Sequence, residues 1–251
     1  MYKITIMIAI ILFATPVWAD EMISFKAGYL VLGPEGKFAV TNGGLTGTKV
    51  DLETDLSFDD SDDLLVEAAL QLDAFRLSAS YLPIELSGHG MLIRDIIFSG
   101  ETYTVGSTVD SDVKLDIYDV GLAWYFINLD DLPIRLQAGF EVAMKYVNAE
   151  VSMIDQISGL STRESVIAPI PTIGARCRLA LGDWLGLVGR IGYLEYNNNK
   201  FLDADIQVEF SPLPLLGFFA GYRHFDLEVD ESGIFIDAMF NGPYAGVLVR
   251  F

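Results

Sequence analysis

Few side chains in this sequence could perform catalysis. Its 251 residues include two histidines, His89 and His224. His224 and Asp226 would share one side of a strand, and Asp203 and Asp205 lie on the predicted strand before it. A histidine beside carboxylates can activate water for hydrolysis. The spacing favours the alternative, a surface histidine beside an acidic loop. We therefore predict no enzyme and no catalytic residue, and keep a His/Asp surface hydrolase as an alternative.

Metal and cofactor chemistry finds little support in the composition. With Cys177 as the single cysteine, no intrachain disulfide forms and no usual zinc site can be built. Acidic residues crowd the segment 59–63, where a divalent cation could bind, but the glycine and distal glutamate of a calcium-binding loop are missing. A solvated acidic surface is the favoured interpretation. We predict no metal, no cofactor and, at a formal net charge of −19, no nucleic-acid partner.

The elements that carry these residues alternate apolar and polar side chains with a period of two. In the segment 201–211, Leu202, Ala204 and Ile206 fall on one face and Asp203, Asp205 and Glu209 on the other. A helix has a period of 3.6, so this alternation predicts strands. The predicted strands are 23–31, 64–73, 75–81, 118–126, 134–146, 173–181, 185–193, 201–211, 218–229 and 234–251.

Short and long connections alternate along the chain, as in membrane barrels with short periplasmic turns and longer external loops. The predicted long loops include 33–63, 88–114 and 148–164. The mean hydropathy of +0.37 is high, yet beyond the N-terminus no stretch is apolar enough for a spanning helix. We predict an all-β fold, a single antiparallel up-and-down transmembrane β-barrel of about ten strands. Eight or twelve strands also fit, because 48–58 could be an extra strand or an external flap. A soluble barrel with charges outside is the main competitor.

The two ends of the chain carry export and assembly signals. Lys3, an apolar run over 4–17 and small residues before Asp20 predict an N-terminal signal helix, cleaved as a signal peptide at 1–19. The domain 20–251 would then be the barrel. The last strand has a terminal aromatic residue, which predicts recognition by the barrel-insertion machinery. The residues of this predicted assembly signal are Tyr244, Gly246, Val249 and Phe251.

Charged side chains of both signs lie on the polar faces of the predicted strands. If the apolar faces meet lipid, these charges fill the lumen, where they must pair to offset their desolvation. We predict a structural ion-pair network and a plugged interior, since narrow barrels have little free lumen. The residues of this predicted network are Lys26, Glu67, Arg76, Arg135, Glu141, Lys145, Arg176, Arg178, Arg190, Asp203, Asp205 and Glu209.

Three segments carry a family resemblance across roughly residues 23–251. They are Val50–Leu56, Phe98–Gly106 and Phe240–Gly246. Together they resemble proteobacterial outer-membrane β-barrel proteins without an assigned activity, among the small OmpA/OmpX-like barrels. The resemblance implies an outer-membrane location and offers no catalytic residues to transfer.

The resulting hypothesis is an integral barrel of the cell outer membrane with a structural or surface-interaction role and a charge-plugged lumen. Its expected partners are outer-membrane lipid and lipopolysaccharide, and we expect a monomer. Two alternatives stay open, a narrow passive channel for small solutes and the surface hydrolase.

Overall fold

The computed structural model describes residues 22–41, 47–129, 134–182, 184–197, 199–231 and 233–251. In this part of the chain the regular elements are strands. No described helix is long and apolar enough to cross a membrane. The predicted signal peptide at 1–19 lies outside the described residues.

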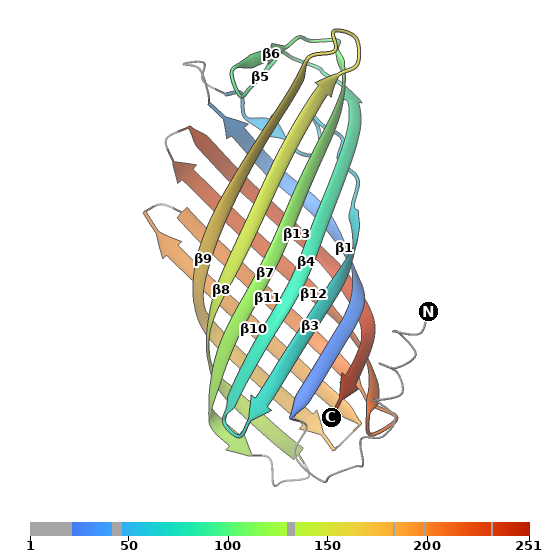
Figure 1. Ribbon diagram of the computed structural model, residues 1–251, viewed down its shortest axis with the longest axis vertical. Coiled ribbons are helices and arrows are strands. Elements are labelled where there is room, and N and C mark those ends of the chain that lie inside the picture. Colours follow the sequence, from blue (N-terminus) through green and yellow to red (C-terminus); the bar gives the residue numbers. More distant parts are fainter. Residues whose placement is uncertain (1–21, 42–46, 130–133, 183, 198, 232) are drawn as a thin grey trace, which may run out of the picture.

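Ten long antiparallel strands close into a barrel (Figure 1). Their bounds are β1 Ile23–Val40, β3 Ser61–Leu72, β4 Phe75–Met91, β7 Thr108–Leu129, β8 Ile134–Asp155, β9 Ser161–Leu181, β10 Leu185–Tyr196, β11 Asn199–Phe210, β12 Leu216–Glu231 and β13 Ile234–Arg250. Each long strand pairs with the next along the chain, and β13 pairs with β1 to close the barrel. The predicted all-β barrel of ten strands is confirmed.

Three short strands belong to the loops at one end. They are β2 Val50–Asp51, β5 Ile96–Phe98 and β6 Glu101–Tyr103. We call this the upper end, as in Figure 1, and the end where β1 begins and β13 finishes the lower end. Connections at the lower end include the short turn after β3, where Asp73 adopts a φ of 52°. Aspartate tolerates this left-handed conformation better than most residues do.

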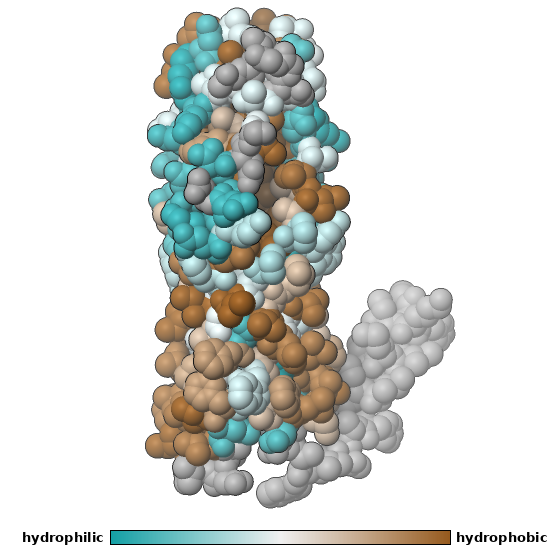
Figure 2. Space-filling view, turned by 90° about the vertical axis from the view of Figure 1, so that its left-hand side faces the viewer, coloured by the Kyte–Doolittle hydropathy of each residue, from teal (hydrophilic) through white to brown (hydrophobic). Residues whose placement is uncertain are grey.

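Halfway up the barrel the apolar side chains change from the outer to the inner face of the wall, and β7 shows this within one strand. In its lower part the outward residues are the exposed, apolar Tyr118, Val120, Leu122, Trp124 and Phe126. In its upper part the outward residues are Asp110, Asp112, Lys114 and Asp116. The inward residues change in the opposite sense, from Val109, Val113 and Ile117 above to Asp119 below. Figure 2 shows the same division, with an apolar lower half and a hydrophilic upper half.

Aromatic side chains mark both edges of the apolar band. At its upper edge Tyr81 stacks on Tyr118, with ring centroids 4.8 Å apart, and Tyr146 lies opposite Tyr118 in the register. Near the lower edge Trp184 and Phe210 make an edge-on contact at 6.3 Å. Two aromatic girdles around an apolar band are typical of transmembrane barrels. The lower half is therefore the membrane-spanning segment.

The prediction of long upper loops was partly wrong. Residues 33–40, 88–91, 108–114, 148–155 and 161–164, all placed in loops, continue the strands of the barrel. The alternation persists there, but polar residues now face outward into water and apolar residues face inward. Charges such as Asp110 and Asp112 on these stretches were interpreted as loop residues because the apolar face had been assumed to stay outside.

We expect the reversal to be visible in stability. Leu122→Arg places a cation in the middle of the lipid-facing part of β7 and should cost about 2–4 kcal/mol of unfolding free energy. Asp112→Arg, on the same outward face above the band, should change it by less than about 0.5 kcal/mol. Denaturant unfolding of both variants in lipid vesicles measures the difference. Equal losses at the two positions would contradict the assignment of the membrane-spanning half.

Candidate functional site

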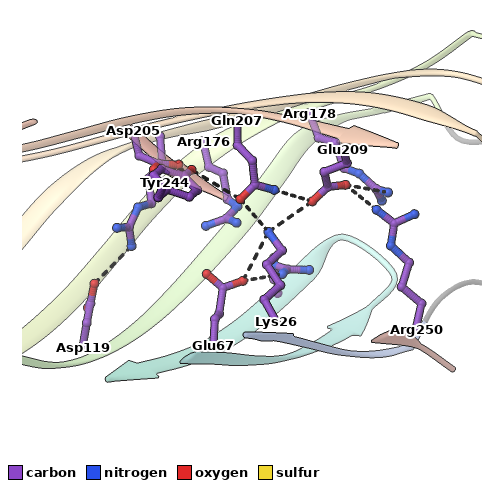
Figure 3. Close-up of polar contacts among 12 residues, drawn as sticks. Lys26, Glu67, Asp119, Arg176, Arg178, Asp205, Gln207, Glu209, Tyr244 and Arg250 are labelled. Atoms are coloured by element: carbon purple, nitrogen blue, oxygen red, sulfur yellow. Dashed lines mark hydrogen bonds and ion pairs between the residues drawn. The ribbon is translucent and has the colours of Figure 1, made fainter. Parts of the chain in front are cut away.

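All ten long strands contribute a charged side chain to the lumen of the membrane-spanning half. Figure 3 shows part of this set, around Lys26, Glu67 and Glu209. Alternation of side chains along each strand turns these residues inward. In strand order the contributors are Lys26, Glu67, Arg76, Asp119, Glu141 with Lys145, Arg176 with Arg178, Arg190, Asp203 with Asp205 and Glu209, Arg223 and Arg250. We call this set the lumen network.

The lower part of the lumen network is centred on Glu209. Its carboxylate lies 3.1 Å from Lys26 Nζ and 3.6 Å from Arg178 Nη2, and it also pairs with Arg250. The side-chain amide of Gln207 donates to Glu209 at 2.7 Å and its carbonyl oxygen accepts from Lys26 at 3.2 Å. These contacts join β1, β9, β11 and β13 across the interior, so they span the closing seam of the barrel.

Two further pairs in the lower lumen join neighbouring strands. Arg76 Nη2 lies 3.2 Å from Glu67, and Arg176 Nη1 lies 3.1 Å from Glu141. Glu67 is also 3.8 Å from Lys26 Nζ. The first pair joins β3 to β4 and the second joins β8 to β9, so adjacent strands are tied to each other as well as across the lumen.

The upper part of the lumen network is centred on Asp203, whose side chain is 1% exposed. Lys145 Nζ lies 2.7 Å from its carboxylate, and both Arg190 and Arg223 donate to it at 3.1 Å. Asp119 accepts from Arg190 at 3.1 Å and pairs with Lys145. Charges this deeply buried are stable only in such paired geometry.

The structure brings together most of the residues predicted for the network. Arg135 lies at the lower end, where it donates to the carbonyl oxygen of Gly182 at 3.1 Å and lines a small cavity together with Arg178 and Arg250. Asp205 accepts a 2.6 Å hydrogen bond from the Tyr244 hydroxyl. Tyr244 was predicted only as part of the assembly signal.

Arg223 was missed by the sequence analysis, although it is 4% exposed and makes two hydrogen bonds to Asp203. Its inward neighbours on β12 are Phe219 and Phe225, so that face looked apolar rather than polar. An arginine between two aromatic residues on one strand face is the signal that could have revealed it, since Arg223 lies over the Phe225 ring at 4.4 Å.

Little free space separates these side chains. Cavities of about 30, 20 and 10 Å³ lie between them. A water molecule needs roughly 10–15 Å³ measured in this way, so each cavity holds a few waters at most. Lys26, Arg176 and Arg178 line the first of them.

Above the lumen network the interior becomes an apolar core. Leu30, Leu82 and Ile84 from the strands are at most 1% exposed. The segment 50–58 folds inward over them as a flap, with Leu56 1% and Phe58 7% exposed. Phe58 pairs by an isolated bridge with Gly88 of β4. Of the two structures considered for 48–58, an extra strand or a flap, the flap is present, with β2 as its one short strand.

An ion pair between buried Asp55 and half-exposed Arg94 holds this flap. Arg94 Nη2 donates both to a carboxylate oxygen of Asp55, at 2.5 Å, and to the Lys49 carbonyl oxygen at 2.6 Å. The backbone N–H of Asp51 donates to Asp55 at 2.9 Å. Burial raises the pKa of Asp55, but the hydrogen bonds from Arg94 and Asp51 outweigh this and hold that pKa below its usual range.

Both histidines lie on the outside of the barrel wall. His224 points outward on β12 and contacts Asn241, whereas Asp203 and Asp205 point into the lumen. His89 pairs with Asp110 on the outer surface of β4 and β7. Sequence proximity had suggested a His/Asp group, but neighbouring positions on paired strands face opposite sides of the barrel wall.

Most acidic residues of the upper half are spread over its outer surface, although Asp55 and Asp155 are buried. Among the described residues no group of three or more histidine, cysteine, aspartate or glutamate side chains is arranged to hold a metal ion.

The residues predicted as the assembly signal, near the C-terminal end of the chain, divide between the two sides of the barrel wall. Tyr244 and Gly246 face the lumen, and Val249 and Phe251 face outward.

Comparison with solved structures places the fold. The chain aligns with the outer membrane protease OmpT from Escherichia coli at a TM-score of 0.59 and 11% identity, covering 95% of this chain and 99% of that one. It also aligns with the translocator domain of the autotransporter NalP from Neisseria meningitidis at a TM-score of 0.47 and 12% identity, over 99% and 94% of the two chains. No protein-family model matches the chain, and no curated protein does. The fold is thus that of bacterial outer-membrane barrels.

Removing the carboxylate at the centre of the upper network should destabilise the barrel strongly. Asp203→Ala leaves Lys145, Arg190 and Arg223 with uncompensated charge, and we expect a loss of about 3–5 kcal/mol in unfolding free energy. The matched control is Glu228→Ala, which breaks an exposed pair with Lys200 and should cost at most about 1 kcal/mol. Denaturant unfolding in lipid vesicles measures both. A small effect at Asp203 would show that the network does not hold the strands together.

The flap should loosen in acid. Because the pKa of Asp55 is lower in the folded protein than the ordinary aspartate value of 3.8, its pairing stabilises the flap above about pH 4. This stabilisation is lost as the pH falls through the depressed pKa. Amide exchange in 50–58, corrected for the intrinsic rate, should therefore rise below pH 4. In Asp55→Asn it should be raised already at pH 7, while Asp59→Asn, at an exposed neighbour, should behave as wild type.

Proposed function

We propose that this protein is an integral outer-membrane barrel that does not conduct solutes and acts through its exposed upper half. The lumen network is the observation that carries the proposal. Its paired charges come from every long strand, and the cavities of about 30, 20 and 10 Å³ between them hold a few waters at most. A solute path would also have to cross the apolar core above, where water and ions find no polar partners.

The same features weaken the alternative of a narrow channel. Opening a path would separate Asp203 from Lys145, Arg190 and Arg223, and each separated charge would cost several kcal/mol. A second obstacle is the flap, which covers the upper core and is anchored by Asp55 and Arg94. A lumen built for conduction would instead keep its charges solvated along a continuous path.

The hydrolase alternative has lost part of its geometric basis, because Asp226 is the only one of its three aspartates that shares the outward face with His224. His224 and Asp203, which the sequence placed on neighbouring strands, lie on opposite sides of the barrel wall. The protease OmpT shares the fold at 11% identity, and a shared fold at that distance does not transfer an activity.

An interaction role follows from where the charge lies. The formal net charge is −19, and the lumen network holds cations and carboxylates in similar number. The negative excess therefore lies mainly on the upper half, in residues such as Asp59, Asp112 and Glu195. A rigid, acidic surface raised above the membrane attracts cationic partners over a Debye length of about 8 Å at physiological ionic strength. Lipid and lipopolysaccharide surround the apolar band below it in this proposal, and the barrel acts as a monomer.

Conductance in planar bilayers tests the proposal directly. We expect no steady current steps from the purified barrel, because no continuous aqueous path crosses the lumen network and the apolar core. A general porin inserted into the same bilayers serves as the positive control. Reproducible single-channel steps that scale with the amount of this protein would favour the passive channel and overturn the closed lumen.

A further inference from the structure

The upper half of the barrel wall has a free strand edge on β9. From Leu181 up to Ile173, β9 pairs with β10, but the register with β10 ends at Ile173 opposite Tyr193. Above this point, residues 161–172 have register partners on β8 alone among the described strands. Figure 1 shows β8 and β9 continuing well above the tip of the β10–β11 hairpin. Every second residue of this stretch therefore directs its backbone N–H and C=O away from β8, toward the opening.

The opposite edge of the same wall is covered, which makes the exposed edge on β9 distinctive. β4 pairs with β3 up to Tyr81, and its upper part runs on beside β7 alone. There the flap lies against it through the Phe58–Gly88 bridge. The approach is so close that a Cβ on Gly88 would lie 2.2 Å from the Leu56 carbonyl oxygen. The chain thus shields one free edge and leaves the other open.

Two prolines limit the open edge from below. Pro169 and Pro171 lack a backbone donor, and proline within sheets is confined mainly to edges where its missing N–H faces away from the ladder. Residues 161–168 retain their donors. Val166 and Ile167 point to opposite faces of the wall, yet they are 41% and 57% exposed. On the inner face, Tyr103 donates to Thr162 at 2.8 Å and Ser99 donates to Glu164, so these two side chains are covered by the β5–β6 segment. The rest of the stretch, from Ser165 to Ile167, is exposed as well as unpaired along its edge.

The surroundings of the open edge differ on its two sides. Inside lie the apolar side chains of Val147, Val151, Ile170 and Leu194, which pack only partly against the upper core. Figure 2, which faces this side of the molecule, shows a hollow in the upper half with apolar residues inside it. Outside, Glu150 lies opposite Ser165 on β8 and pairs with Arg163 of the edge itself at 3.1 Å. Glu195 near the end of β10 and the outward Asp110, Asp112 and Asp116 of β7 keep the surrounding outer surface acidic.

We propose that the β9 edge at residues 161–168 binds an extended peptide of alternating apolar and basic residues by strand addition. The backbone of the peptide would pair with β9, because an unpaired edge is a template for one more strand. Its apolar side chains would cover the partly buried residues inside, and its basic side chains would face the acidic outer surface. This proposal rests on the surface-interaction role given above and names the partner class for it.

Binding of a designed peptide tests the proposal. The probe is a fluorescent peptide of alternating valine and lysine, about eight residues long to match the edge. Fluorescence anisotropy is measured with the full barrel in phosphatidylcholine nanodiscs, and empty nanodiscs correct for binding to lipid. A second probe has the same sequence with N-methyl groups on alternate amides, on the side that would pair with β9. We expect the methylated probe to bind at least tenfold more weakly, although its charge is the same.

Variants at Ser165 separate the backbone from the side chain. Ser165 has the same strand parity as Pro169 and Pro171, so Ser165→Pro removes one more donor from the free edge without breaking the ladder to β8. We expect at least a tenfold loss of peptide binding in Ser165→Pro and none in Ser165→Ala, which keeps the N–H. Heat-modifiable migration on gels verifies that both variants are folded. If Ser165→Pro does not fold, the comparison of the methylated and unmethylated probes still tests whether the peptide backbone pairs with β9.

Three outcomes would overturn the strand-addition proposal. Equal binding of the methylated and unmethylated probes would show charge attraction alone. Unchanged binding to folded Ser165→Pro would place the peptide elsewhere. A wild-type dimer in sedimentation that becomes monomeric in Ser165→Pro would make a second copy of the chain the occupant of the edge. None of these results depends on conductance, so the closed lumen and the peptide site can fail separately.

Discussion

The structure depends on one constraint, which is that a charge removed from water must meet its partner at close range. Asp203 illustrates this, because it is almost completely buried and touches three cations from three other strands. Desolvation of ions of this kind costs several kcal/mol each, so the pairs need not add net stability compared with an apolar filling. The ion pairs instead specify the register in which the strands pair. A one-residue shift in the register of β11 would turn Asp203 toward lipid and leave Lys145, Arg190 and Arg223 without it.

A second constraint is that the barrel crosses two solvents. In the lower half lipid lies outside, so apolar side chains face outward and polar ones face the lumen. In the upper half water lies outside, and the arrangement is the reverse. The change on β7 between Ile117 and Tyr118 needs no insertion, since side chains alternate and each face simply exchanges its composition. The upper half is thus built like a water-soluble barrel with a core, continuous with a membrane barrel below.

This change of solvent decides how much could be predicted from the sequence. Alternation located all ten long strands and their lower ends, because lipid-facing stretches such as 134–146 have a regular apolar face. It also identified most of the lumen network, since charges such as Lys26 and Glu67 stand opposite that face. The pattern of the sequence misses the upper parts of the strands, because apolar side chains are expected to face outward along the full length of each strand. Arg223 was lost for a related reason, as its aromatic neighbours Phe219 and Phe225 face inward with it.

The way the lumen network is shared among strands has a consequence for biogenesis. Lys26 belongs to the first long strand, while its partner Glu209 belongs to β11 and is shared with Arg250 on the last one. A partly assembled sheet that has not yet joined its two ends therefore presents unsatisfied ions along one face. Such an intermediate is poorly suited to lie in hydrocarbon and gains its missing partners all at once when the ends meet. Closure of the seam between β1 and β13 would then be a cooperative final event, and the ion pairs would stabilise the closed barrel once it has formed.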